Sequence, residues 1–152
     1  DGVSPLRLGN DHPSIEPFAT YATADGDLMI GAGNDEQFAR LCAAIGLEPD
    51  SRFATNELRV ANRAAVREAL EARLRTAPTE RWQEVLRAAN VPAGPVQTIG
   101  EAFSLAESLG LDVVDETDGV RTVAFPARLS RTPARVRRRP PELGEHSEEF
   151  SL

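Results

Sequence analysis

The sequence contains little of what several kinds of site require. It has one cysteine, Cys42, so no internal disulfide can form, which fits a reducing compartment and predicts a cytoplasmic location. Its two histidines, His12 and His146, lie far apart, and neither has a second ligand at metal spacing, so we expect no metal site. No apolar run approaches the length of a membrane span, so we expect no membrane contact.

The composition is that of a globular protein with an acidic balance. In the 152 residues, 41% hydrophobic and 27% charged side chains are enough to build an ordinary packed domain. The net charge of -7 disfavours nucleic acid as a partner, because phosphate binding needs a basic surface. The chain starts at Asp1 without a methionine, and we interpret it as part of a longer protein.

Two pairs of strand-like runs each surround an Asp-Gly dipeptide. The first pair covers residues 18–23 and 27–32 about Asp25-Gly26, and the second covers residues 113–117 and 120–125 about Asp118-Gly119. Asp-Gly suits a type I′ turn, whose central residues both need positive φ. We therefore predict two hairpins, and we expect them to join one small antiparallel sheet.

Four helices are predicted between and beside these hairpins. Their ranges are residues 34–46, 62–75, 79–90 and 98–110, and the N-caps are assigned to Asn34, Thr79 and Thr98. Phe38, Leu41, Cys42 and Ile45 form an apolar stripe on the first helix. The order predicts an α+β fold in which a small antiparallel sheet packs with about four helices, followed by an extended C-terminal tail.

Taken alone, the residues offer one carboxylate of interest. Asp35 follows a strand and opens a helix, where side chains often point into a cleft, although an ordinary helix-start acid is the simpler interpretation. Asp35→Asn keeps the shape of the side chain while removing its charge, so we expect it to change folding little. Gly31-Ala32-Gly33 does not continue as a phosphate-binding glycine motif, because Glu36 stands at the final position.

Six short segments stand in a fixed order over nearly the whole chain. They are residues 7–15 (RLGNDHPSI), 30–38 (IGAGNDEQF), 53–63 (FATNELRVANR), 91–96 (VPAGPV), 129–133 (LSRTP) and 143–147 (LGEHS). Together they resemble the pattern of CoA-transferase family III, the CaiB/BaiF group, in the C-terminal portion that includes its small domain. The resemblance implies a loop from the large domain at residues 1–17, a small α+β domain at residues 18–127, and a Pro/Arg-rich return segment and tail at residues 128–152.

The same resemblance implies the chemistry. Family transferases move CoA from an acyl-CoA thioester to a carboxylic acid through an aspartate nucleophile, without a covalently bound cofactor, and two subunits interlock as a homodimer. The nucleophile belongs to the large domain, so we expect this chain alone to be inactive. Gly9, Asn10 and His12 match a loop near the active site, and Asp35 matches the place of a glutamate near the catalytic pair of the related racemases.

Two other functions remain open at this stage. An α-methylacyl-CoA racemase of the same superfamily would move an α-proton with acid and base groups, and it would need a histidine base beside the aspartate. A non-catalytic assembly module is the alternative from another class. The sequence names neither the acyl group nor the acceptor.

Overall fold

A computed structural model describes residues 7–150, which divide after Val96 into two compact units. The first unit holds β1 (Phe18–Ala22), β2 (Asp27–Gly31), α1 (Asp35–Ile45), the 3-10 helix η1 (Ser51–Phe53), α2 (Asn56–Ala61), α3 (Arg63–Leu74), α4 (Thr79–Ala88) and β3 (Ala93–Pro95). The second holds α5 (Ile99–Ser108), β4 (Val114–Thr117), β5 (Val120–Val123) and the 3-10 helix η2 (Ser147–Phe150). The expected small domain of residues 18–127 spans both units and stays a prediction.

The α+β class is confirmed, but the predicted single sheet is wrong in one respect. The two hairpins lie in different sheets: β1, β2 and β3 form one antiparallel sheet, and β4 pairs with β5 in the other. The third strand of the first sheet is β3, from the segment between Pro92 and Val96. Its prolines leave the backbone extended, so it can pair with β2 beside it.

The two Asp-Gly dipeptides form different turns. Thr117 pairs with Val120, and the residues between them, Asp118 and Gly119, have φ of 52° and 76°, which fits the predicted two-residue type I′ turn. The first hairpin is not of this type. Ala22 pairs with Asp27, so residues 23–26 all lie in the loop, and Gly26 has no positive φ.

The longer first turn provides a cap for α4. The N-cap residue is Pro78 rather than Thr79, and it makes no side-chain capping bond. Instead, the Thr79 N–H donates to Asp25 Oδ1 at 2.8 Å, and this bond lowers the pKa of Asp25 below its usual range. The helix N-terminus is therefore capped from the hairpin, which no local sequence pattern indicates.

Helices α1 and α5 follow their local signals. Asn34 caps α1 by accepting a bond from the Gln37 N–H, and Gly46 ends it with φ of 68°. Thr98 and Glu101 form the predicted capping box of α5. The short helix α2, which begins after Thr55, was not predicted.

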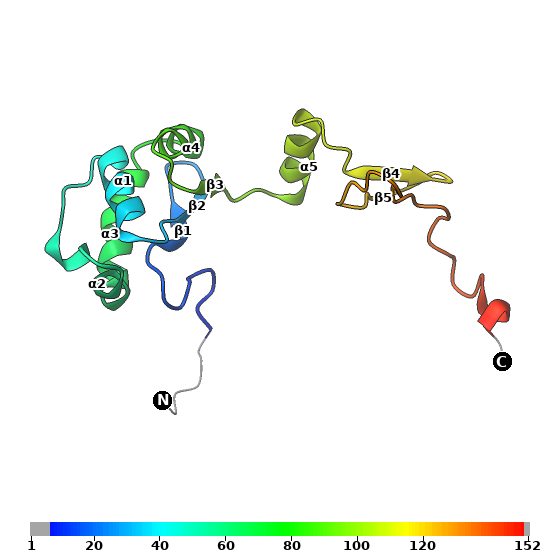
Figure 1. Cartoon of the computed structure of the whole chain (residues 1–152), viewed down its shortest axis with the longest axis horizontal. Helices are drawn as coiled ribbons and strands as arrows, with labels where there is room; N and C mark the ends of the chain where they lie inside the picture. Colours follow the sequence, from blue (N-terminus) through cyan, green and yellow to red (C-terminus); the bar gives the residue numbers. More distant parts are fainter. Residues whose placement is uncertain (1–6, 151–152) are drawn as a thin grey trace, which may run out of the picture. The chain divides into compact units, whose positions relative to one another are not determined.

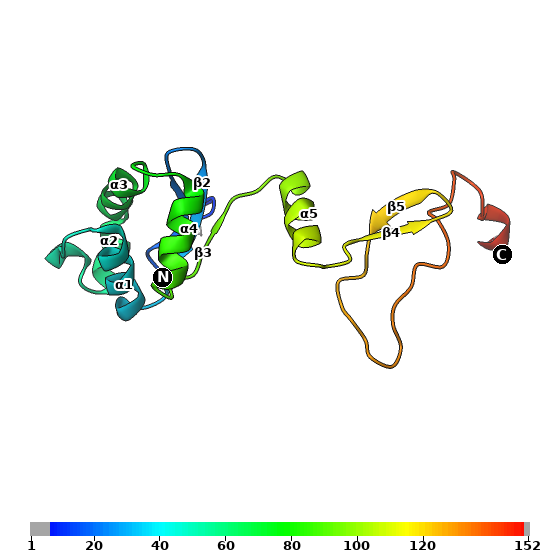
Figure 2. The same cartoon turned by 90° about the horizontal axis from the view of Figure 1, so that it is seen from above.

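The core of the first unit lies between its sheet and its helices. Helix α3 packs on β1, α4 packs on β2 and β3, and α1 packs on α4, as Figure 1 and the view from above in Figure 2 show. The buried apolar side chains include Leu28, Leu41, Leu70, Trp82 and Leu86. This packing gives the first unit the rigid support on which a site can be built.

The second unit buries far less of its apolar surface. No residue of α5 is buried, and Ile99 is 79% exposed. Residues 124–146 form no helix or strand, in agreement with the predicted extended tail. Within the described range, every helix is too short or too polar to cross a membrane.

Candidate functional site

Asp35 lies at the first position of α1 and is joined to a buried arginine. Its Oδ1 accepts a hydrogen bond from Arg59 Nη2 at 2.8 Å, and the Asp35 side chain remains 55% exposed. Arg59 is completely buried. A charged side chain is rarely buried to this extent unless it is paired, so the ion pair is a principal structural role of Asp35.

The remaining Arg59 donors bind main-chain oxygens. Nε donates to the Glu16 carbonyl at 2.6 Å and Nη1 to the Phe53 carbonyl at 3.0 Å, while the guanidinium stacks 4.4 Å from the centre of the Phe38 ring. Among the described residues, Asp35 supplies the one carboxylate that pairs with Arg59. The structure therefore predicts a larger effect of Asp35→Asn on folding than the sequence alone does, because the substitution leaves a buried cation without its counter-charge.

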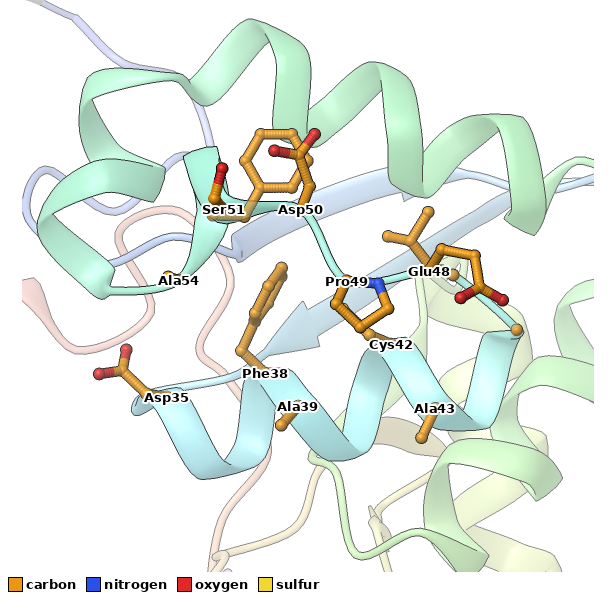
Figure 3. Close-up of a pocket in the computed structure, with 13 residues that line it drawn as sticks. Asp35, Phe38, Ala39, Cys42, Ala43, Glu48, Pro49, Asp50, Ser51 and Ala54 are labelled. Atoms are coloured by element: carbon orange, nitrogen blue, oxygen red, sulfur yellow. The ribbon is translucent and has the colours of Figure 1, made fainter.

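A pocket opens beside Asp35, along one face of α1. It has a volume of about 690 Å³ and lies between α1 and the segment from Gly46 to Ala54. Figure 3 shows Asp35 at one end, with Phe38 pointing toward the facing segment. Cys42 also lines it, and burial raises the pKa of that thiol to about 11, so Cys42 is uncharged at neutral pH and no ready nucleophile.

The loop predicted to lie near the active site forms a tight turn before β1. The Asp11 N–H donates to the Leu8 carbonyl at 3.1 Å across Gly9 and Asn10, and Gly9 has φ of 62°, which favours glycine. Asn10 is exposed. The turn leads directly into His12, whose N–H donates to the Phe18 carbonyl at 3.0 Å.

A row of polar side chains on α2 and α3 holds the segment that follows this turn. We call it the clamp row; its members are Asn56, Arg59, Arg63 and Arg67. Asn56 and Arg59 are three residues apart on α2, and Arg63 and Arg67 are four apart on α3, so each pair lies on one face of its own helix. Every member bonds to the segment from Asp11 to Glu16, and Arg59 does so through the Glu16 carbonyl.

The two ends of the clamp row bind the ends of the segment. Asn56 Nδ2 donates to the Ser14 carbonyl at 2.9 Å, and Asn56 Oδ1 accepts from the Glu16 N–H at 3.1 Å. Arg67 Nη2 donates to Asp11 Oδ1 at 2.8 Å. These contacts fix the main chain at one end of the segment and the Asp11 carboxylate at the other.

Arg63 binds the middle of the segment. Its Nη2 donates to the carbonyls of His12 and Pro13 at 2.7 and 2.8 Å, and its Nη1 donates to Glu16 Oε2 at 3.0 Å. Glu16 is 2% exposed, and its other oxygen accepts a bond from Tyr21 Oη at 2.7 Å. Burial raises the pKa of Glu16, while Tyr21 and Arg63 act in the opposite direction.

The structure therefore links the predicted site residues indirectly. Among the described residues Asp35 and His12 share no hydrogen bond, but Arg59 joins Asp35 to the Glu16 carbonyl, and Arg63 joins Glu16 to His12. The described chain gathers no three histidine, cysteine, aspartate or glutamate side chains that could hold a metal ion. The candidate site thus has two parts. One is the loop of Gly9, Asn10 and His12, which leads into the segment held by the clamp row, and the other is the Asp35 carboxylate beside an apolar pocket.

The family model described as CoA-transferase family III matches residues 1–147. The chain belongs to CoA-transferase family III.

Characterised relatives and solved structures agree with this membership. The succinate–glutarate CoA-transferase of Agrobacterium fabrum is 40% identical over 95% of this chain, which spans 38% of that protein. The succinyl-CoA:glutarate CoA-transferase of Mus musculus is 36% identical over 93% of the chain and 34% of its own length. The structure of a CaiB/BaiF family protein from Brucella suis, 36% identical, has a TM-score of 0.79 and covers 98% of this chain and 40% of its own.

The structure explains the role of one motif of the family III pattern, the segment of residues 53–63. The segment from Phe53 to Arg63 contributes three members of the clamp row, and Arg59 is the residue whose importance sequence reasoning missed. A partial signal was present, since Asn56, Arg59 and Arg63 are three and four residues apart. Glu16 was also missed, because nothing in its neighbours indicates that it is buried.

Proposed function

We propose that this chain is the C-terminal part of an acyl-CoA:carboxylate CoA-transferase. The observation that carries the proposal is the 40% identity to the succinate–glutarate CoA-transferase over 95% of this chain. The chain spans about 38% of that relative, so the rest of the site is assigned to residues outside it. The relatives reported above are named as transferases, which favours transfer over racemisation.

The substrates proposed are a short acyl-CoA and a small dicarboxylic acid. Succinate and glutarate appear in the names of several relatives, and an acetyl-CoA:oxalate CoA-transferase of Acetobacter aceti is 36% identical over 85% of the chain. These acids differ in length but share two carboxylates. A site that accepts them therefore needs hydrogen-bond donors for carboxylate oxygens.

The proposed reaction passes through an aspartyl nucleophile supplied by residues outside this chain. The aspartate carboxylate attacks the acyl-CoA carbonyl and releases CoA thiolate, leaving a mixed anhydride. The thiolate then attacks the aspartyl carbonyl, releasing the first acid and forming an enzyme–CoA thioester. The acceptor carboxylate reverses both steps, so that CoA leaves on the new acid and the aspartate is regenerated.

This chain contributes the supporting half of the proposed site. Gly9, Asn10 and His12 form its loop, and Asp35 faces the cleft from the start of α1. The coenzyme A thioester is a substrate, and the chemistry requires no covalently bound cofactor. Two full-length subunits would interlock as a homodimer in the cytoplasm, where a reducing environment keeps Cys42 as a thiol.

The experiment is a transfer assay with the full-length parent. Succinyl-CoA is incubated with glutarate, and glutaryl-CoA is measured by mass spectrometry, with Asp35→Asn as the site variant. We expect transfer by the parent, and a reduced kcat/KM in the variant once its folding has been verified. Failure of the wild-type parent to form any new CoA ester from this pair or from acetyl-CoA and oxalate would overturn the proposal.

A further inference from the structure

The surroundings of the His12 side chain favour one tautomer of the neutral ring. Its Nδ1 accepts a hydrogen bond from the Ser14 N–H at 3.2 Å. A ring nitrogen that accepts a hydrogen bond carries no proton, so a neutral imidazole has its hydrogen on the other nitrogen, Nε2. His12 therefore presents an N–H donor rather than a basic nitrogen on its outer side.

The ring is also held in place. It packs against Phe18 in a tilted arrangement, with the ring centres 5.3 Å apart and the planes at 57° to each other. The main chain at His12 is fixed on both sides, because its N–H donates to the Phe18 carbonyl and its carbonyl accepts from Arg63. Among the residues described, none forms a hydrogen bond with Nε2, and the side chain is half-exposed.

We propose that His12 Nε2–H donates a hydrogen bond to an acyl oxygen of the substrate, and that Arg63 is the residue that positions it. The proposal rests on the proposed CoA-transferase function. The acyl oxygen is either the thioester carbonyl of the acyl-CoA or a carboxylate oxygen of the acceptor acid, since both present acceptors and no donor. A fixed donor binds such an oxygen without reorganising, which is the property that makes it effective.

Arg63 suits the positioning role because its bonds divide between loop and core. One side of the guanidinium binds the carbonyls of His12 and Pro13, and the other binds the buried Glu16 carboxylate. A lysine has the same charge but lacks the fork that spans these acceptors. Arg63→Lys should therefore loosen the loop while keeping the charge beside Glu16.

The substitutions that separate a donor from a base are made in the full-length parent. In His12→Gln the amide nitrogen can stand near the position of Nε2 and still donate, whereas in His12→Asn the shorter amide stands near Nδ1. We expect His12→Asn to raise KM about 10- to 100-fold, the range for a hydrogen bond to a charged group, and His12→Gln to stay within about threefold of wild type. Comparison of KM for acyl-CoA with KM for the acid identifies the substrate whose oxygen is bound.

The matched control is His146→Asn, at the other histidine, which pairs with Glu149 within the second unit. It should leave both KM values unchanged. If His12→Gln is as impaired as His12→Asn, and wild-type kcat/KM falls at acidic pH as a base is protonated, His12 acts as a base and the donor role is refuted. Unchanged KM values in both His12 variants would refute it equally.

The positioning role is tested by a double-mutant cycle. Arg63→Lys should raise KM by about 10-fold in the wild-type parent and should add nothing in a His12→Ala background, because Arg63 acts through His12. Full additivity of the two substitutions would overturn this role. Urea titration of each variant keeps a loss of fold distinct from a loss of binding.

The protonation pattern is measured directly in this chain. Nitrogen-15 spectra of the imidazole should show a protonated Nε2 and an unprotonated Nδ1 at alkaline pH. In Arg63→Lys, part of the population should instead carry the proton on Nδ1. A protonated Nδ1 in the wild-type chain would overturn the inference. If the full-length parent transfers no CoA, both the proposed function and the substrate role of His12 are refuted. The tautomer of His12 is decided by these spectra alone.

Discussion

Replacement of Asp35 by asparagine measures how much the buried arginine depends on its counter-charge. Asparagine keeps the shape and an acceptor oxygen, so the change removes charge and little else. Breaking a fully buried ion pair costs about 3–5 kcal/mol, but Asp35 is 55% exposed, and water screens its side of the pair. We therefore expect a loss in the range of a charged hydrogen bond, about 2–3 kcal/mol in the free energy of unfolding.

The assay is a urea titration followed by fluorescence, because Trp82 is the one tryptophan of the chain and is buried in the first unit. Glu36→Gln is the matched control. It removes the same charge from the same helix turn, but Glu36 pairs with Arg40 at the surface, so its loss should stay below about 1 kcal/mol. An Asp35→Asn loss no larger than that of Glu36→Gln would show that Asp35 is an ordinary helix-start acid.

Two further predictions concern α4 and α1. Trp82→Ala should cost about 3–5 kcal/mol in urea titration, because it empties core volume and leaves the Leu74 carbonyl without the 2.6 Å bond from Nε1; a loss well under 1 kcal/mol would contradict the packing. Cys42 should be alkylated with a pH midpoint of about 11 in the folded chain, and of about 8.5 in concentrated urea. Burial places the folded pKa above the unfolded one, so stability should fall as the pH rises between them. A folded midpoint near 8.5 would refute the burial.

What the sequence predicts well is what a few neighbouring residues determine. Asn34 and Gly46 bound α1 as expected, because capping and left-handed φ are local requirements. The Asp118-Gly119 turn is correct for the same reason. Asp25-Gly26 carries an identical local signal, but Asp25 bonds to Thr79 on α4, and this tertiary contact accompanies a longer loop.

The parts that could not be predicted depend on contacts distant in the chain. The role of Arg59 rests on Glu16 and Asp35, which lie 43 and 24 residues away. Sequence alone does not show that a guanidinium at position 59 is buried, since arginine is usually exposed. The candidate loop was located by resemblance, whereas its support by the clamp row became visible only when α2 and α3 were placed beside it.

The most direct test of the central claim is the location of the covalent intermediate. The full-length parent and this 152-residue chain are each incubated with succinyl-CoA, then treated with borohydride or hydroxylamine, and the modified residue is identified by peptide mass spectrometry. The account predicts a CoA-dependent adduct on an aspartate of the parent that lies outside this chain, and no adduct or turnover in the chain alone. A CoA-dependent adduct on Asp35, or on any other carboxylate of this chain, together with turnover would contradict it.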